Sequence, residues 1–154
     1  MPDRAREVID AWFAGQEELA VESVGDQGWF TVLRGDHKRT IPVYLELGAN
    51  AVSVESFFMA APDENQAEVY AYLLRRNTRT YTLRFALADT GDLMLVGVVP
   101  RAAIDAEELD RLFGQLLVAA DETYNSALRK GFAAYIEREQ AWRAKVGAPR
   151  NPIT

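Results

Sequence analysis

The longest apolar pattern in the sequence fills its last third and limits what the chain can fold into. Apolar residues recur every three or four positions over residues 109–128, as on one face of an α-helix, and the pattern continues to Trp142. A straight helix of about 40 residues would be roughly 60 Å long, whereas a domain of this chain length has a radius of gyration of about 15 Å. We therefore expect either a break around residues 125–131 or packing of the far half on another chain. Both alternatives place Trp142 outside the central core.

The first half of the sequence predicts one helix and then a meander of strands. Asp3 is a suitable N-cap for a helix that ends near Gly15. Three β-rich runs follow at residues 29–35, 40–48 and 51–59, separated by Gly, Asp and Asn. Pro42 indicates an edge strand or a strand start, because proline cannot donate a ladder hydrogen bond. Alternate residues of the middle run should share one face: Ile41, Val43, Leu45 and Leu47.

A second helix and a hairpin are predicted in the middle of the chain. The helix carries Val69 and Leu73 at helical spacing and ends in Arg75 and Arg76, which complement the helix dipole, before the stop residue Asn77. Residues 80–87 alternate in polarity, and an acidic turn at 89–92 leads into the run 93–99, which is apolar on both faces. That run needs cover on both sides. Asp105 then resembles the start of a capping box for the long C-terminal helix.

Composition restricts the possible functions. The 154 residues are 49% hydrophobic, include 17 Lys and Arg against 23 Asp and Glu, and contain no cysteine. A net charge of -6 disfavours nucleic-acid binding, which depends on basic side chains. The absence of cysteine excludes disulfides and thiolate metal sites and suits a reducing compartment. With neither a signal-peptide pattern nor a long apolar run, we expect a cytoplasmic protein that does not bind membranes.

The sequence carries no recognisable catalytic constellation. The sole histidine, His37, lies in a polar segment between two predicted strands. The acidic turn at 89–92 lacks the further ligands of a calcium loop, and neither a phosphate-binding loop nor a nucleophile elbow occurs. We therefore expect a protein that is not an enzyme and has no cofactor and no metal site.

Two groups of residues are candidates for binding. A basic cluster stands out against the acidic background and would suit an acidic segment or a small anion. Aromatic residues on the meander would suit an extended peptide, and since Phe57 and Phe58 are neighbours in a strand, one belongs to the core and the other to the surface. The candidate binding residues are Arg75, Arg76, Asn77, Arg79, Arg84, Phe57, Phe58 and Tyr44.

The expected element order is α-βββ-α-ββ-α. That order, together with LLRRN, FALADTGDLMLVGVV and DAEELDRLFGQLLVAADE, resembles the YbjN family, which is similar in fold to the type III secretion chaperones. Of the family's recurring positions, Asn77, the acidic turn at 89–92 and the pair Ala120 and Asp121 can be matched. The resemblance implies an α+β fold with a twisted antiparallel sheet of about five strands flanked by helices, commonly dimeric and without catalytic residues. It spans the chain to about residue 122.

The resemblance also implies a function and a domain plan. Chaperones of this fold bind extended client segments, and other members are labelled as sensory transduction regulators. We expect a bacterial protein-binding module, chaperone-like or regulatory and homodimeric; the alternative is a sensor in which Arg76 and Arg84 bind a small anion. One domain should span residues 1–147, with a helical extension at 124–147 and a disordered tail at 148–154. Candidate interface residues lie in that extension: Leu128, Phe132, Tyr135, Ile136 and Trp142.

Overall fold

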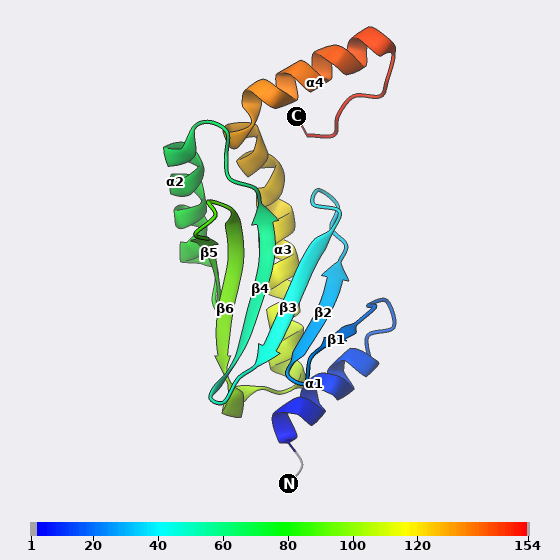
Figure 1. Cartoon of the computed structure of the whole chain (residues 1–154), viewed down its shortest axis with the longest axis vertical. Coiled ribbons are helices and arrows are strands. Elements are labelled where there is room, and N and C mark those ends of the chain that lie inside the picture. Colours follow the sequence, from blue (N-terminus) through cyan, green and yellow to red (C-terminus); the bar gives the residue numbers. More distant parts are fainter. Residues whose placement is uncertain (1–2, 154) are drawn as a thin grey trace.

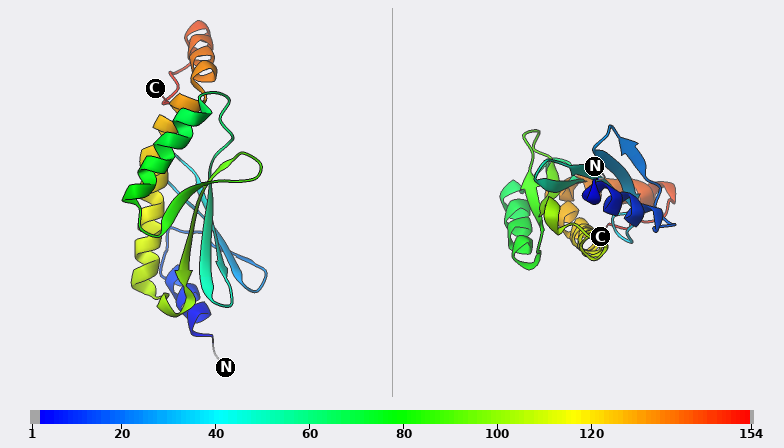
Figure 2. Two further views of the ribbon diagram at one scale, coloured as in Figure 1. Left: turned by 90° about the vertical axis from the view of Figure 1, so that its left-hand side faces the viewer. Right: turned by 90° about the horizontal axis from the view of Figure 1, so that it is seen from below.

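A computed structural model describes residues 3–153. Its centre is one antiparallel sheet in the order β1-β2-β3-β4-β6-β5. The strands are β1 (Glu22–Val24), β2 (Gly28–Leu33), β3 (Ile41–Leu47), β4 (Ala51–Met59), β5 (Leu83–Leu87) and β6 (Leu93–Pro100). Helices α1 (Arg4–Ala14), α2 (Gln66–Arg76) and α3 (Ala106–Gly131) lie on one face of this sheet, and α4 (Ala133–Val146) projects beyond one end (Figure 1, Figure 2). The predicted α+β fold is confirmed.

The sheet has six strands, one more than the sequence led us to expect. The additional strand, β1, is three residues long, and all three are exposed. It pairs with β2 alone, with Glu22 opposite Phe30. A strand without buried residues leaves no period-two pattern in the sequence, so its formation depends on the neighbouring edge of β2.

The meander follows the predicted alternation. Ile41, Val43, Leu45 and Leu47 are all buried under the helices. Since β3 lies between β2 and β4, Pro42 marks the start of an inner strand and not an edge. Pro42 is opposite Val32 on β2.

Side-chain caps fix the ends of the helices. The Asp3 carboxylate accepts a hydrogen bond from the Arg6 N–H at 3.3 Å, and Asp105 accepts one from the Glu108 N–H at 2.8 Å. Asn77 follows the last residue of α2 and bonds both backbone groups of Phe85, accepting from its N–H at 2.7 Å and donating to its carbonyl at 3.2 Å. The end of α2 is thereby attached to β5. A short 3-10 turn, η1 (Asn77–Arg79), follows α2, and η2 (Arg101–Ala103) follows β6.

The core lies between the sheet and the helices, chiefly under α3. Leu109, Leu112 and Leu116 are buried there, and loss of any one of these side chains to alanine costs about 2–5 kcal/mol in such sites. An aromatic cluster joins α1 to α3, since the ring centroids of Trp12 and Phe113 are 4.5 Å apart. The apolar pattern of the sequence therefore serves mainly the core.

The long helical pattern breaks at Phe132, directly after Gly131 and therefore at the end of the predicted region. The cause is a contact with the segment that enters α2. The Gly131 carbonyl accepts hydrogen bonds from the N–H groups of Asp63 and Glu64 at 3.0 and 3.1 Å. The Glu64 carboxylate then accepts one from the Ala134 N–H at 2.7 Å, in the first turn of α4. One loop thus ends α3 and starts α4.

Beyond the break, α4 contains no buried residue, and Trp142 is 60% exposed. Trp142 lies outside the core, as both alternatives required. Residues 148–153 return along α4, and Figure 1 shows this segment curling back beneath the helix. Within residues 3–153, none of the helices is both long and apolar enough to cross a membrane.

Candidate protein-binding site

The face of the sheet opposite the helices carries a mixture of apolar and charged side chains. One row in register across five strands consists of Phe30, Tyr44, Glu55, Val96 and Arg84. Phe30, Tyr44 and Val96 are partly buried, whereas Glu55 and Arg84 are exposed. We call this row, together with Phe57, Met94 and Val98, the open face. Among the described residues no helix covers it, as Figure 2 shows.

A hollow of about 510 Å³ runs across the open face between β3 and β5. Val96 and Gly97 form its apolar floor, with Glu46 and Glu55 on one side and Arg84 on the other. Gly97 contributes only backbone to this floor, because its Cβ direction is towards the opposite face, where a Cβ would lie 3.2 Å from the Leu83 Cδ2. An apolar floor between an acidic and a basic border suits an extended polypeptide better than a compact ligand.

Three of the predicted binding residues lie on the open face: Tyr44, Phe57 and Arg84. Phe57 is 40% exposed, whereas its neighbour Phe58 is fully buried against Phe85 and Tyr124. The expected division between these two phenylalanines is therefore correct. Phe58 belongs to the core.

The other predicted residues lie around the end of α2. Arg76 forms an ion pair with Glu122 of α3 at 3.3 Å, on the helical side of the sheet. Arg84 instead donates to the carbonyl of Tyr81 at 2.6 Å and extends from the open face. Arg75 and Arg79 are exposed. Because Arg76 and Arg84 belong to opposite faces, the pair is not arranged to hold one small anion.

A second apolar surface was missed by sequence reasoning. It surrounds a hollow of about 200 Å³ between α2 and the edge strand β5, and we call it the α2–β5 patch: Tyr70, Leu73, Leu74, Phe85, Ala86, Leu87 and Leu93. Leu74 is 64% exposed. The available signal was the pair Leu73 and Leu74, because neighbouring residues on a helix cannot both face the core.

The predicted interface residues of the C-terminal extension separate into two sets. Leu128, Phe132, Tyr135 and Ile136 line a groove at the junction of α3 and α4, with Phe57 and Phe58 from β4. Trp142 does not line this groove. It shares an exposed stripe of α4 with Tyr135 and Val146, which we call the α4 stripe.

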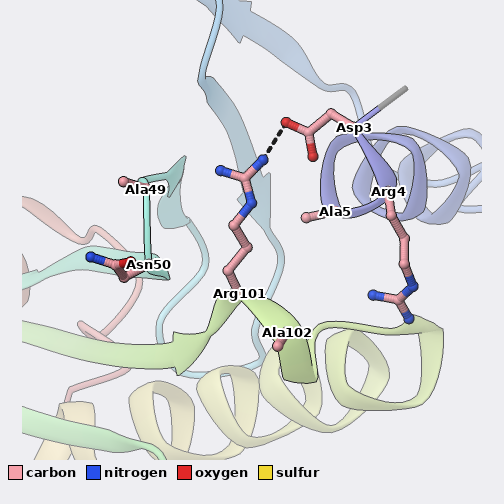
Figure 3. Close-up of a pocket in the computed structure, with 7 residues that line it drawn as sticks. All are labelled: Asp3, Arg4, Ala5, Ala49, Asn50, Arg101 and Ala102. Carbon is pink, nitrogen blue, oxygen red and sulfur yellow. Dashed lines mark hydrogen bonds and ion pairs between the residues drawn. The ribbon is translucent and has the colours of Figure 1, made fainter. Parts of the chain in front are cut away.

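Near the start of α1, an open pocket of about 500 Å³ is lined by Asp3, Arg4 and Arg101, and Figure 3 shows Arg101 pointing towards Asp3 and Arg4 pointing away from it. Arg101 bonds the Asp3 carboxylate and the Gly48 carbonyl. The hydrogen bond from Arg101, with that from the Arg6 backbone, holds the pKa of Asp3 below its usual value. Arg4 donates to the Ile104 carbonyl at 3.0 Å. These bonds attach the start of α1 to the segment that follows β6, and through Arg101 to the turn between β3 and β4.

Asp121 of α3 anchors the loop between β2 and β3. Its Oδ1 accepts hydrogen bonds from the N–H groups of His37 and Lys38 at 2.7 and 2.8 Å. Desolvation raises the pKa of this carboxyl, but backbone hydrogen bonds from Lys38, His37 and Asp36 outweigh that effect and lower it. The buried Lys38 ammonium lies 4.7 Å from the Tyr124 ring centroid, and burial lowers its pKa. The histidine thus belongs to a structural loop.

Solved structures share this arrangement of sheet and helices. A chain of the heterodimeric ExoU–SpcU complex, from the type III secretion system of Pseudomonas aeruginosa, matches with a TM-score of 0.55 at 20% identity, over 81% of this chain and 98% of that one. A chain of the ExsC–ExsE complex also gives 0.55, at 21% identity, over 79% and 90%. At these identities the likeness concerns the fold. The molecule has the fold of the type III secretion chaperones.

The sequence identifies the family. Residues 5–129 match the model of the YbjN family, described as "Putative bacterial sensory transduction regulator". The chain belongs to this family, and the resemblance recognised in the sequence is confirmed. The match ends before α4 and the segment 148–153, so the surfaces formed by that extension lie outside the shared pattern.

Relatives of this chain occur in mycobacteria. An uncharacterised protein of Mycobacterium tuberculosis is 43% identical over 115 residues, which are 75% of this chain and 63% of that protein. One of Mycobacterium leprae is 37% identical over 121 residues, which are 79% and 66% of the two chains. The chain therefore aligns with slightly less than two thirds of the length of the Mycobacterium tuberculosis relative.

Proposed function

We propose that this protein is a non-enzymatic, chaperone-like or regulatory adaptor of a bacterial cytoplasm that binds an extended segment of a partner protein on the open face. The observation that carries this proposal is the composition of that face. A β-sheet in a single domain normally buries its apolar side chains under another layer, yet Phe30, Tyr44 and Val96 remain only partly covered.

The fold supports the same reading. Two of the structural neighbours come from complexes of two proteins, and a third comes from the HopA1–SchA chaperone–effector complex, with a TM-score of 0.54 at 14% identity over 73% of this chain and 86% of that one. Glu46, Glu55 and Arg84 border the hollow with opposite charges, and charges at the rim of an interface contribute mainly to orientation and specificity.

A matched pair of substitutions tests the open face. Val98 on β6 is 61% exposed on the open face, and Val118 on α3 is 51% exposed on the helical side. We expect tagged protein recovered from its own cells to carry one stoichiometric protein partner. Val98→Glu should reduce the recovered partner at least tenfold, whereas Val118→Glu should not. Equal recovery with both variants, or recovery of no partner under mild lysis, contradicts the proposal.

We further propose that the protein is a homodimer and that the second copy packs on the α4 stripe. Tyr135, Trp142 and Val146 are each more than half exposed on one face of α4, and burial of such side chains stabilises by about 1.5–3 kcal/mol each. Trp142→Glu should therefore convert a dimer to a monomer in light scattering after size exclusion. Leu74→Glu, in the α2–β5 patch, is the matched control, and dissociation by that variant alone would move the interface there.

A further inference from the structure

A polypeptide segment already forms one side of the groove at the junction of α3 and α4. The space left open has a volume of about 330 Å³ and is lined by aromatic and aliphatic side chains from β4, α3 and α4, together with Asn151 and Ile153 of the returning segment. Asn151 is buried although it is polar and close to the chain's end. We call residues 149–153 the return segment and the space around it the junction groove.

The side chain of Gln140 binds the backbone of the return segment. The Asn151 N–H donates to Gln140 Oε1 at 2.9 Å, and Gln140 Nε2 donates to the Asn151 carbonyl at 3.0 Å. This is the paired donor and acceptor pattern that a neighbouring strand would offer. Gln140 Nε2 also lies 3.4 Å from the Ile153 carbonyl, and Arg143 donates to the Pro149 carbonyl at 2.9 Å. These hydrogen bonds involve only main-chain atoms of the return segment. They would therefore form with any segment that has the same backbone shape.

Side chains of the return segment indicate what else would fit. The Asn151 side chain accepts from the Ile153 N–H at 2.9 Å, which turns the chain so that Ile153 joins the apolar lining. A segment that fits the same place therefore has an Asn and, two positions later, a branched aliphatic residue. α4 buries no residue of its own, so the bonds of Gln140 and Arg143 are a large part of what holds the segment.

The junction groove is continuous with the open face. Phe57 belongs to both, because the register of β4 against β6 shifts between Phe57 and Met59 and brings the neighbouring residues of β4 to the groove lining. An extended partner that follows the open face towards the end of β4 therefore reaches the place that the return segment occupies. A tethered segment competes at an effective concentration in the millimolar range.

We infer that the return segment is an internal competitor: in the free protein it occupies one side of a peptide-binding site, the junction groove, whose other occupant is an extended partner segment with an Asn and, two residues later, a branched aliphatic side chain. This inference rests on the proposed function, since it adds a second contact to the same partner. The partner gains the groove only by displacing residues 149–153.

Protease protection tests whether the segment is held as described. Trypsin cleaves after Arg150, directly before the hydrogen-bonded Asn151. In the full chain we expect Gln140→Ala to speed this cleavage at least tenfold, whereas Glu137→Ala, on the exposed side of α4, leaves it unchanged. Mass spectrometry separates this product from cuts within α4 at Arg138 or Arg143, which would report unfolding of the helix. Equal rates after Arg150 in all three proteins would overturn the inference.

Binding in trans tests the groove itself. In a full-length variant with Asn151→Pro and Ile153→Asp, the first change removes the N–H that Gln140 accepts and the second makes the anchor charged. The probe is the peptide APRNPIT, titrated to millimolar concentration and followed by the NMR signals of the Gln140 side-chain amide. In this variant we expect the Gln140 amide signals to shift saturably towards their positions in the unaltered protein. In the unaltered protein, at least tenfold more peptide should be needed to change these signals.

Absence of a saturable shift in the released variant would show a packing contact without a binding site and would overturn the inference. Addition of Arg143→Ala to that variant leaves the Gln140 signals in place and should raise the peptide concentration needed for the shift, because the hydrogen bond to the Pro149 carbonyl is lost. Neither experiment includes a partner protein. A negative result in these two experiments therefore leaves the proposed adaptor function intact. Conversely, the groove can bind the peptide even if Val98→Glu does not reduce the recovered partner.

Discussion

At the scale of single residues, the positions that match the family's recurring pattern hold backbone segments together. Asn77 bonds Phe85 on β5, and Asp121 bonds the loop before β3. Asp92, in the acidic turn, accepts from the Ala61 N–H at 3.1 Å and so attaches the hairpin to the end of β4. Asn77 takes the place of a strand neighbour of β5, and the two aspartates fix a loop and the chain after β4. These positions therefore support the fold.

Asp121 gives a prediction at this scale. Its folded pKa lies below the ordinary value of 3.8, so the ionised group contributes stability above that value, and the contribution is lost as pH falls through the folded pKa. Asp121→Asn should lower the free energy of unfolding at pH 7 by up to about 1 kcal/mol, since the group is partly exposed. In urea titrations this difference should shrink towards pH 3. The exposed Asp89→Asn is the control, and a pH-independent difference would contradict the role of the charge.

At the scale of elements, the sequence predicts features that follow from a repeating pattern of buried residues. It does not predict features that depend on a contact between distant residues. Ile41, Val43, Leu45 and Leu47 alternate because one face of β3 is covered, so the pattern is visible without a structure. The break at Phe132 depends on Asp63 and Glu64, almost 70 positions away, and no local pattern carries that information. The placement of Arg76 and Arg84 on opposite sides of the sheet likewise follows from the topology. The alternation of β5 indicated only that Arg84 points away from the face that buries Leu83 and Phe85.

The same break predicts opposite effects of one substitution at two glycines of α3. A Cβ at Gly131 would lie 2.9 Å from the Pro62 Cβ, whereas nothing lies within 4 Å of a Cβ at Gly114. Gly131→Ala should destabilise by about 1–3 kcal/mol through overpacking. Gly114→Ala should stabilise by up to about 1 kcal/mol through helix propensity. Thermal and urea unfolding measure both, and stabilisation by Gly131→Ala would show that the helical segments are free to move apart.

At the scale of the whole molecule, an uncovered sheet must stay soluble while it has no partner. Glu46 and Glu55 interrupt the open face with charge, in the way that charged side chains oppose sheet association in natural proteins. Replacement of both by glutamine should raise self-association in light scattering across a concentration series at pH 7. Glu107→Gln with Glu137→Gln changes the net charge equally on exposed helical positions. Equal scattering from the two double variants would assign solubility to net charge alone.

The two rims of the sheet differ in a way that limits growth of any polymer. β5 is five residues long, but the Asn77 side chain already pairs with the N–H and the carbonyl of Phe85 at its middle, whereas β1 is only three residues long. Asn77 therefore blocks the centre of one rim, and three residues at the other rim provide too few ladder bonds to template another chain. Strand addition is opposed at both rims, so the molecule resists extension into a fibre.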